Sequence, residues 1–170
     1  MRRDALARMP SHPAFVVDAM LGRLARWLRV LGYDTIYDPA LSDRGQVELA
    51  AAERILLTRD RHLLRELRPR RAIEIRSDAP LEQLRQVVET LALEPPAELF
   101  TRCLVCNTPL VDVPPSAYAT LVPPASRGLP GPVRQCPTCE RVYWPGSHAR
   151  RMRRALAATL PAWIGSVGGE

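Results

Sequence analysis

Two aspartates stand at the ends of the most apolar runs in the chain. Asp18 follows Ala14-Phe15-Val16-Val17, and Asp60 closes the run Ile55-Leu56-Leu57-Thr58-Arg59-Asp60. Such runs are typical of strands that are buried on both faces of a parallel sheet. The carboxyl ends of parallel strands share one edge, and sites form in the crevice beyond that edge. Asp18 and Asp60 are therefore candidate ligands for a hard divalent cation, Mg²⁺ or Mn²⁺.

Two further aspartates are candidates for the same site. Asp78 stands three residues after another apolar run, and Asp43 opens a helical pattern after the second predicted strand. Carboxylates held close together repel one another, and a divalent cation removes that repulsion. Such a site can activate water and stabilise the transition state of phosphodiester cleavage.

Helix capping is the alternative interpretation of all four aspartates. An aspartate before a helix is a preferred N-cap, worth about 1 kcal/mol. Capping fits Asp43 and Asp78 best, because a serine precedes each, and it fits Asp18 and Asp60 least. Asp34 and Asp38 flank the second predicted strand and are expected to be solvated turn acids.

Arginines accompany the acids. Arg23, Arg26 and Arg29 recur every third residue along one predicted helix, and Arg59 precedes Asp60. We expect these four side chains to bind substrate phosphates, with a solvated helix face and neutralisation of the acids as the alternatives. All 24 basic residues are arginine, which excludes a P-loop lysine or a Schiff base.

The four cysteines form two CxxC motifs, Cys103-Leu104-Val105-Cys106 and Cys136-Pro137-Thr138-Cys139. One tight turn can present both sulfurs of such a motif to one ion, and two turns complete the tetrahedral shell of a structural zinc. Two disulfides or a redox pair are the competing interpretations, but disulfides are rare in cytosolic proteins. The motifs predict a zinc ribbon that ligates zinc through Cys103, Cys106, Cys136 and Cys139.

Alternating strand and helix patterns must position these residues. Strands are predicted over 14–18, 34–38, 55–58 and 72–75, and helices over 19–31, 42–53, 61–67, 80–91 and 147–160. This alternation predicts an α/β fold with a mainly parallel sheet. We divide the chain into a tail (1–13), an α/β domain (14–97), a zinc ribbon (98–146) and a basic helix with a tail (147–170).

Charge and hydropathy narrow the partners. The net charge is +6, and residues 98–170 alone carry +4, so we expect a polyanionic partner at that end. No run of 18 apolar residues and no secretory signal are present, so we predict a cytoplasmic protein without a membrane partner.

Several segments together resemble one known family. The segments are Asp18-Ala19-Met20-Leu21-Gly22-Arg23-Leu24-Ala25-Arg26-Trp27-Leu28-Arg29, Leu31-Gly32-Tyr33-Asp34, Leu57-Thr58-Arg59-Asp60, the two cysteine pairs and Tyr143-Trp144-Pro145-Gly146-Ser147-His148. They resemble the Mut-seven C-terminal RNase family, which has a PIN-like nuclease domain followed by a zinc ribbon. The resemblance covers about residues 14–155.

The resemblance implies a PIN-like sheet and a metal-dependent endoribonuclease. PIN-type nuclease sites use four acids. The first follows the first strand, the second lies in a helix, the third belongs to a Thr-x-Asp sequence at the end of a later strand, and the fourth lies further downstream. Asp18 and Asp60 match the first and third of these positions, and Asp78 matches the last by order. Asp43 is our choice for the helical acid, with Glu48 and Glu53 as alternatives.

Other functions stay open at this point. The chain could be a non-catalytic RNA- or ribosome-binding module, or a toxin-like nuclease that a protein partner controls. RNA is the expected partner, but no motif separates RNA from single-stranded DNA. A homodimer is also left open.

Overall fold

A four-stranded parallel sheet forms the first part of the protein. The computed structural model describes residues 12–163. The strands lie in the order β2-β1-β3-β4, and all neighbouring pairs are parallel. Their bounds are Ala14–Val17 for β1, Thr35–Tyr37 for β2, Arg54–Thr58 for β3 and Ala72–Glu74 for β4. The predicted α/β class and the mainly parallel sheet are confirmed.

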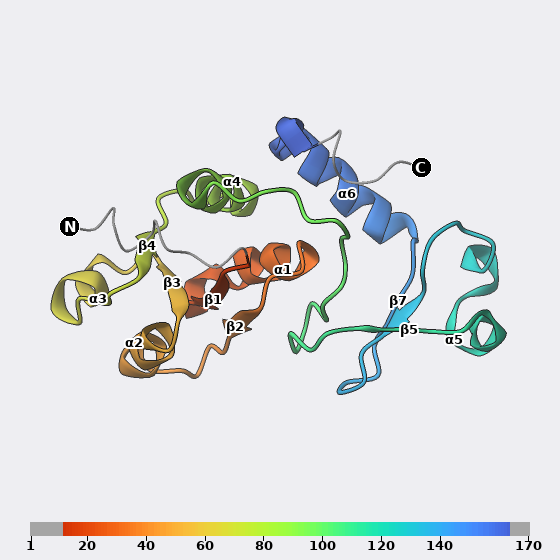
Figure 1. Ribbon diagram of the computed structural model, residues 1–170, viewed down its shortest axis with the longest axis horizontal. Coiled ribbons are helices and arrows are strands. Elements are labelled where there is room, and N and C mark those ends of the chain that lie inside the picture. Colours follow the sequence, from red (N-terminus) through yellow and green to blue (C-terminus); the bar gives the residue numbers. More distant parts are fainter. Residues whose placement is uncertain (1–11, 164–170) are drawn as a thin grey trace.

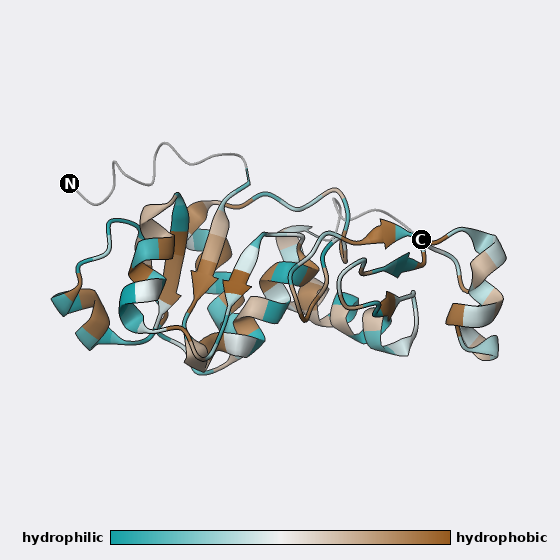
Figure 2. Cartoon of the chain, turned by 90° about the horizontal axis from the view of Figure 1, so that it is seen from below, coloured by the Kyte–Doolittle hydropathy of each residue, from teal (hydrophilic) through white to brown (hydrophobic). Residues whose placement is uncertain are grey.

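Helices cover both faces of this sheet (Figure 1). They are α1 (Gly22–Val30), α2 (Asp43–Ala51), α3 (Arg61–Glu66) and α4 (Pro80–Leu91). Alternate strand residues point to opposite faces. Phe15 and Leu57 belong to the core with α1 and α4, whereas Val16 and Leu56 belong to the core with α2 and α3. This two-sided burial explains why the buried stretches of β1 and β3 are apolar, and much of the strand surface is brown in Figure 2.

The strand order creates a switch point between β1 and β3. The chain leaves β1 towards β2 on one side, and returns to build β3 and β4 on the other side of β1. The carboxyl ends of β1 and β3 are therefore neighbours, with their following connections directed to opposite sides. Open α/β sheets bind ligands at such points.

The helix predicted over 19–31 begins as a 3₁₀ turn, Ala19–Leu21, before α1 continues to Val30. Gly32 follows the C-cap residue Leu31 and has a φ of +87°, so it ends the helix. A Cβ atom at Gly32 would lie 2.7 Å from the Thr101 hydroxyl oxygen. Both the backbone conformation and the close approach require glycine at this position.

The cysteine-containing segment forms a second, smaller unit. Three short strands pair antiparallel in the order β5-β6-β7, with bounds Val111–Asp112, Arg134–Gln135 and Val142–Tyr143. Between β5 and β6 lie short helical turns that the sequence did not predict: Pro115–Ala117, α5 (Tyr118–Leu121) and Pro124–Ser126. Val113, Val122 and Val133 form a small core of their own beneath these turns.

The last helix, α6 (Ser147–Thr159), returns to the first unit. Leu156, Leu160 and Trp163, the last of these in the final turn Pro161–Trp163, belong to the same core as α1 and α4. Arg85 of α4 donates a hydrogen bond to the Thr159 carbonyl over 3.2 Å. The predicted division at residue 147 stays a prediction, and the tails 1–11 and 164–170 lie outside the described residues.

The substitution Gly32→Ala tests the end of α1. We expect it to lower the free energy of unfolding by about 1–2 kcal/mol, the cost of a left-handed conformation for an alanine. Gly128→Ala is the matched control, because a Cβ there meets no atom within 4 Å. Urea unfolding followed by circular dichroism measures both, and equal stability of the two variants would contradict the assignment.

Candidate active site and metal centre

A buried hydroxyl group joins Asp18 to Asp60 at the switch point. Thr58, the last residue of β3, is fully buried and donates from its hydroxyl to Asp18 Oδ2 over 2.7 Å. The same oxygen accepts the backbone N–H of Asp60 over 2.9 Å. The N–H of Asp18 in turn donates to the Leu57 carbonyl over 3.0 Å, which extends the pairing of β1 with β3. The two aspartates are thus fixed relative to one another through one threonine.

Both of these aspartates also cap helices. Asp18 accepts the Met20 N–H and begins the 3₁₀ turn, and Asp60 Oδ1 accepts the N–H groups of His62 and Leu63 at 2.7 and 3.0 Å. The expectation of which aspartates cap helices was therefore wrong. Asp18 and Asp60, which were expected to suit capping least, are caps, while the side chains of Asp43 and Asp78 cap no helix.

Serine explains the reversal at α2. The Ser42 hydroxyl accepts the Gly45 N–H over 3.2 Å and takes the N-cap position, so Asp43 becomes the first helical residue and is exposed. Its carboxylate lies at the helix N-terminus, which favours negative charge. Glu48 and Glu53, the alternatives for the helical acid, are also exposed.

Asp78 reaches the neighbourhood of Asp60 through an ion pair. It pairs with Arg59, and its side chain is 86% exposed. Arg61 pairs in the same way with Glu74 over 2.7 Å. The two arginines that flank Asp60 therefore neutralise acids, which was the alternative to phosphate contact.

Glu74 is an acid at this edge that the sequence reasoning missed. It is the last residue of β4 and lies in register with Thr58, which itself neighbours Asp18. Residues in register on neighbouring strands point to the same face of a sheet. A glutamate at the end of a predicted strand, where the sheet edge is shared, was the available signal.

The described residues contain one group of three or more potential metal ligands within 4.8 Å of one another, and it consists of the four cysteines. The four predicted aspartates do not converge to that distance. A magnesium ion needs only one or two carboxylates, because it keeps several water ligands. Asp18 and Asp60 therefore stay candidates for such a site, because both are carboxylates at the switch point of the sheet.

The cysteine sulfurs have the spacing that zinc requires. Cys103 Sγ lies 3.5 Å from Cys139 Sγ, and Cys106 Sγ lies 3.4 and 3.7 Å from the sulfurs of Cys136 and Cys139. Four thiolates about 2.3 Å from a zinc ion lie roughly 3.8 Å apart at tetrahedral angles. All four cysteines are free rather than disulfide-bonded. The donor set and its geometry fit a structural zinc, as expected for a ribbon.

The two CxxC turns have the same backbone geometry. The residue after each second cysteine, Asn107 or Glu140, has a positive φ of 68° or 58°. Its N–H donates to the carbonyl of Cys103 or Cys136 over 3.0 or 2.9 Å. Hydrogen bonds from Thr108 lower the pKa of the Cys106 thiol to about 6.

Arg29 connects the first CxxC turn to the parallel sheet. Its guanidinium donates to the Thr35 carbonyl at 3.1 and 2.9 Å, and to the carbonyls of Leu104 and Val105 at 3.0 and 2.8 Å. The residue is only 4% exposed, and burial lowers its pKa while the nearby thiols oppose that shift. These contacts occupy Arg29, whereas Arg23 and Arg26 on the same helix are exposed.

Asn107 makes a second connection between the two units. Its side-chain Nδ2 donates to Asp34 Oδ1 over 2.7 Å, and its side-chain Oδ1 accepts the Thr35 N–H over 3.0 Å. Asp34 also accepts two hydrogen bonds from Arg54, and this arginine, with Asn107, holds the pKa of Asp34 below its usual value. The expectation that Asp34 is a solvated turn acid was therefore wrong.

The fold and the cysteine cluster define an α/β protein with an appended unit consistent with a zinc ribbon. The family model described as the Mut7-C RNAse domain matches residues 13–156, so the chain belongs to that family. Membership indicates a nuclease or RNA-related role, and the resemblance seen in the sequence is confirmed. No curated protein and no solved structure matches the chain.

The described part of the chain contains no candidate for a membrane-spanning helix. None of its helices is both long and apolar enough to cross a bilayer.

The substitution Thr58→Val tests the two hydrogen bonds through which Thr58 connects Asp18 and Asp60. Valine keeps the shape but removes the donor to Asp18 and the acceptor for the Asp60 N–H. We expect a loss of about 1–3 kcal/mol in the free energy of unfolding, because buried polar groups lose their partners. Thr58→Ser keeps the hydroxyl and should retain more stability in the same urea titration. A serine variant less stable than the valine variant would refute the role of the hydroxyl.

Elemental analysis tests the cysteine cluster. We expect about one zinc ion per chain, and a lower melting temperature for the whole protein after chelation, because Arg29 and Asn107 join the ribbon to the sheet. A metal-free chain with two disulfides would contradict the assignment, as would an unchanged melting temperature after complete zinc removal.

Proposed function

We propose that this protein is a metal-dependent endoribonuclease with its catalytic cation site at Asp18 and Asp60. The main support for this proposal is the position of the two aspartates at the switch point of the sheet, where the buried Thr58 hydroxyl connects them. Membership in an RNase-domain family supports the nuclease class. Oxygen ligands of this kind suit Mg²⁺ or Mn²⁺.

The two carboxylates keep acceptor capacity for a cation. Asp18 uses one oxygen for Thr58 and the other for the Met20 N–H, and a carboxylate oxygen has a second lone pair. Asp60 uses only Oδ1 for capping. A divalent cation held here would supply activation of water and stabilisation of charge on the scissile phosphate.

We assign graded roles to the surrounding side chains. Arg23 and Arg26 are exposed on the helix that follows Asp18, so they are the proposed phosphate contacts. Arg59 uses one guanidinium nitrogen in its pair with Asp78 and keeps other N–H donors for a phosphate, whereas Arg29 is left out because backbone carbonyls occupy it. Asp78 and Asp43 are proposed as outer members of the acidic set, since both follow strands at the same edge.

A second function has its own support. Asp18 and Asp60 both cap helices, and Asp78 is ion-paired with Arg59, so each of these acids has a structural use. A non-catalytic RNA-binding or ribosome-binding module would need no more than this. A cytoplasmic location and a homodimer stay predictions.

Cleavage of a labelled mixed-sequence RNA separates these two functions. We expect activity that depends on added Mg²⁺ or Mn²⁺ and falls at least about 100-fold in Asp18→Asn and in Asp60→Asn, the order seen when a group that stabilises transition-state charge is lost. Glu89→Gln is the control, because Glu89 is an exposed acid in the last turn of α4, whose first turn is the one that follows β4 at the carboxyl edge of the sheet.

Two outcomes would reject the catalytic proposal. Cleavage that is unchanged in both Asp18→Asn and Asp60→Asn would place the activity elsewhere. Tight RNA binding without cleavage in either metal would favour the non-catalytic module.

A further inference from the structure

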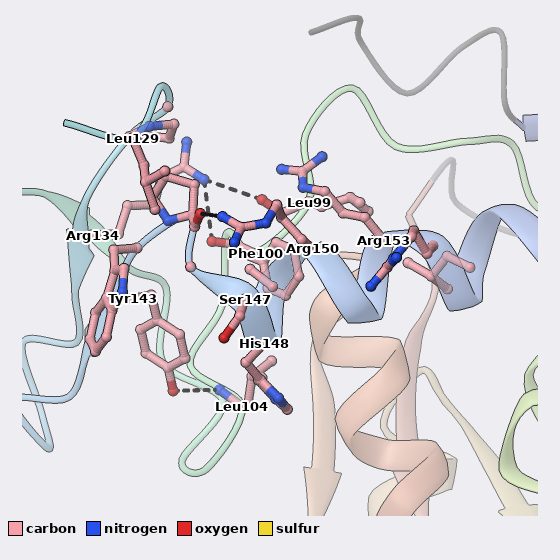
Figure 3. A pocket seen from close by; sticks show the side chains of 18 of the residues that line it. Leu99, Phe100, Leu104, Leu129, Arg134, Tyr143, Ser147, His148, Arg150 and Arg153 are labelled. Carbon is pink, nitrogen blue, oxygen red and sulfur yellow. Dashed lines mark hydrogen bonds between the residues drawn. The ribbon is translucent and has the colours of Figure 1, made fainter. Parts of the chain in front are cut away.

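A large cleft lies between α6 and the cysteine-containing unit, away from the aspartates. Its volume is about 1060 Å³, and α6, β7 and the loop over residues 126–132 form its walls. In Figure 3, Arg150 and Arg153 extend from α6 on one side, and Leu129 and Arg134 lie on the other. Leu31, at the end of α1, also lines the cleft and connects it to the sheet domain.

The walls of the cleft combine apolar surface with positive charge. Aromatic and aliphatic groups line it, including Phe100, Tyr143 and Trp144. Four arginines and one histidine also line it, and no aspartate or glutamate among residues 12–163 does. This composition complements a ligand that carries both flat apolar groups and negative charge.

The arginines of the cleft differ in their interactions. Arg134 is tied to Glu98, Asp112 and two backbone carbonyls, so its role is structural. Arg150, Arg153 and Arg154 are exposed, and no carboxylate within residues 12–163 pairs with them. Arg153 lies 5.5 Å over the Phe100 ring, which holds its charge at the wall.

The start of α6 adds to the positive potential. Gly146 is its N-cap residue and supplies no side-chain acceptor, and Gly146, Ser147 and His148 line the cleft. The first N–H groups of a helix carry partial positive charge and favour anions. Two independent features, the arginines and this helix end, therefore direct anionic groups to the same wall.

Single-stranded nucleic acid fits these walls better than other polyanions. Its phosphates can pair with the arginines, while unpaired bases can stack on aromatic rings and cover the apolar surface. A duplex would present phosphates but would keep its bases away from that surface. The volume is at the upper end of the range for small-ligand sites, which favours a segment of several groups over one small anion.

We propose that this cleft binds a single-stranded segment of the RNA substrate that lies several nucleotides away from the bond that is cleaved. That the bound nucleic acid is RNA follows from the proposed function, on which this inference rests. Asp18 lies at the beginning of the turn and helix that end at Leu31, so the two sites are separated by roughly 20 Å along the helix axis. An RNA that occupies both must span several nucleotides, and the cleft then contributes affinity rather than chemistry.

The double variant Arg150→Gln/Arg154→Gln tests the cleft in an Asp60→Asn background, which keeps the RNA intact. Fluorescence anisotropy with a labelled single-stranded RNA measures binding at several salt concentrations. We expect an affinity loss of roughly tenfold and a salt slope reduced by about 1.4, the value for two lost phosphate contacts on a single strand. Arg65→Gln/Arg70→Gln removes the same charge from exposed positions in and after α3, and should bind as the parent does.

A second measurement does not depend on any substitution in the cleft. An RNA that contains 4-thiouracil should cross-link, on irradiation, to peptides from residues 142–157. Equal binding by the cleft and control variants would overturn the proposal, and so would cross-links confined to other segments. Unchanged RNA binding together with altered oligomeric state would assign the cleft to a second copy of the chain.

Failure of this proposal can be told apart from failure of the nuclease proposal. Loss of RNA affinity in the cleft variant, with no cleavage by the unsubstituted protein, would keep the cleft and reject catalysis. Normal cleavage with no effect of the cleft variant on affinity would keep catalysis and reject the cleft.

Discussion

The hydroxyl of Thr58 connects the two carboxylates on which the proposed chemistry depends. It donates to Asp18 and accepts from the backbone of Asp60, and it is fully buried at the end of β3. Its position follows from the parallel pairing of β1 with β3, which brings the ends of two apolar strands together. Because a buried hydroxyl with two partners has little freedom, the relative placement of the acids is set before any cation or RNA binds.

The cysteine cluster imposes the second constraint. A zinc ion with four thiolates carries net negative charge, and the buried guanidinium of Arg29 lies beside it as a counter-charge. Arg29 and Asn107 contact β2 and the first CxxC turn together, so the ribbon supports the same sheet that holds the aspartates. The ribbon also forms one wall of the proposed RNA cleft, so a zinc ion bound there would support that wall as well as the sheet.

The sequence predicted the elements better than their contacts. Apolar runs and helical periodicity located the four parallel strands and five of the helices, because these patterns are local. Strand order and the antiparallel ribbon sheet depend on pairing between distant segments, so periodicity did not supply them. The order of the capping aspartates was misjudged because Ser42 takes the N-cap position before Asp43, and Ala79 takes the one after Asp78. Arg29 was expected to bind substrate, and its burial depends on a turn 75 residues away.

Anomalous diffraction from crystals soaked in Mn²⁺ would locate the catalytic cation. We expect a manganese peak within coordination distance of the carboxylates of Asp18 and Asp60, separate from any zinc peak among the cysteines. The peak would also show whether Asp43, Glu74 or Asp78 moves to complete the shell. A soaked crystal with no manganese at Asp18 or Asp60, at concentrations that support cleavage, would contradict the account.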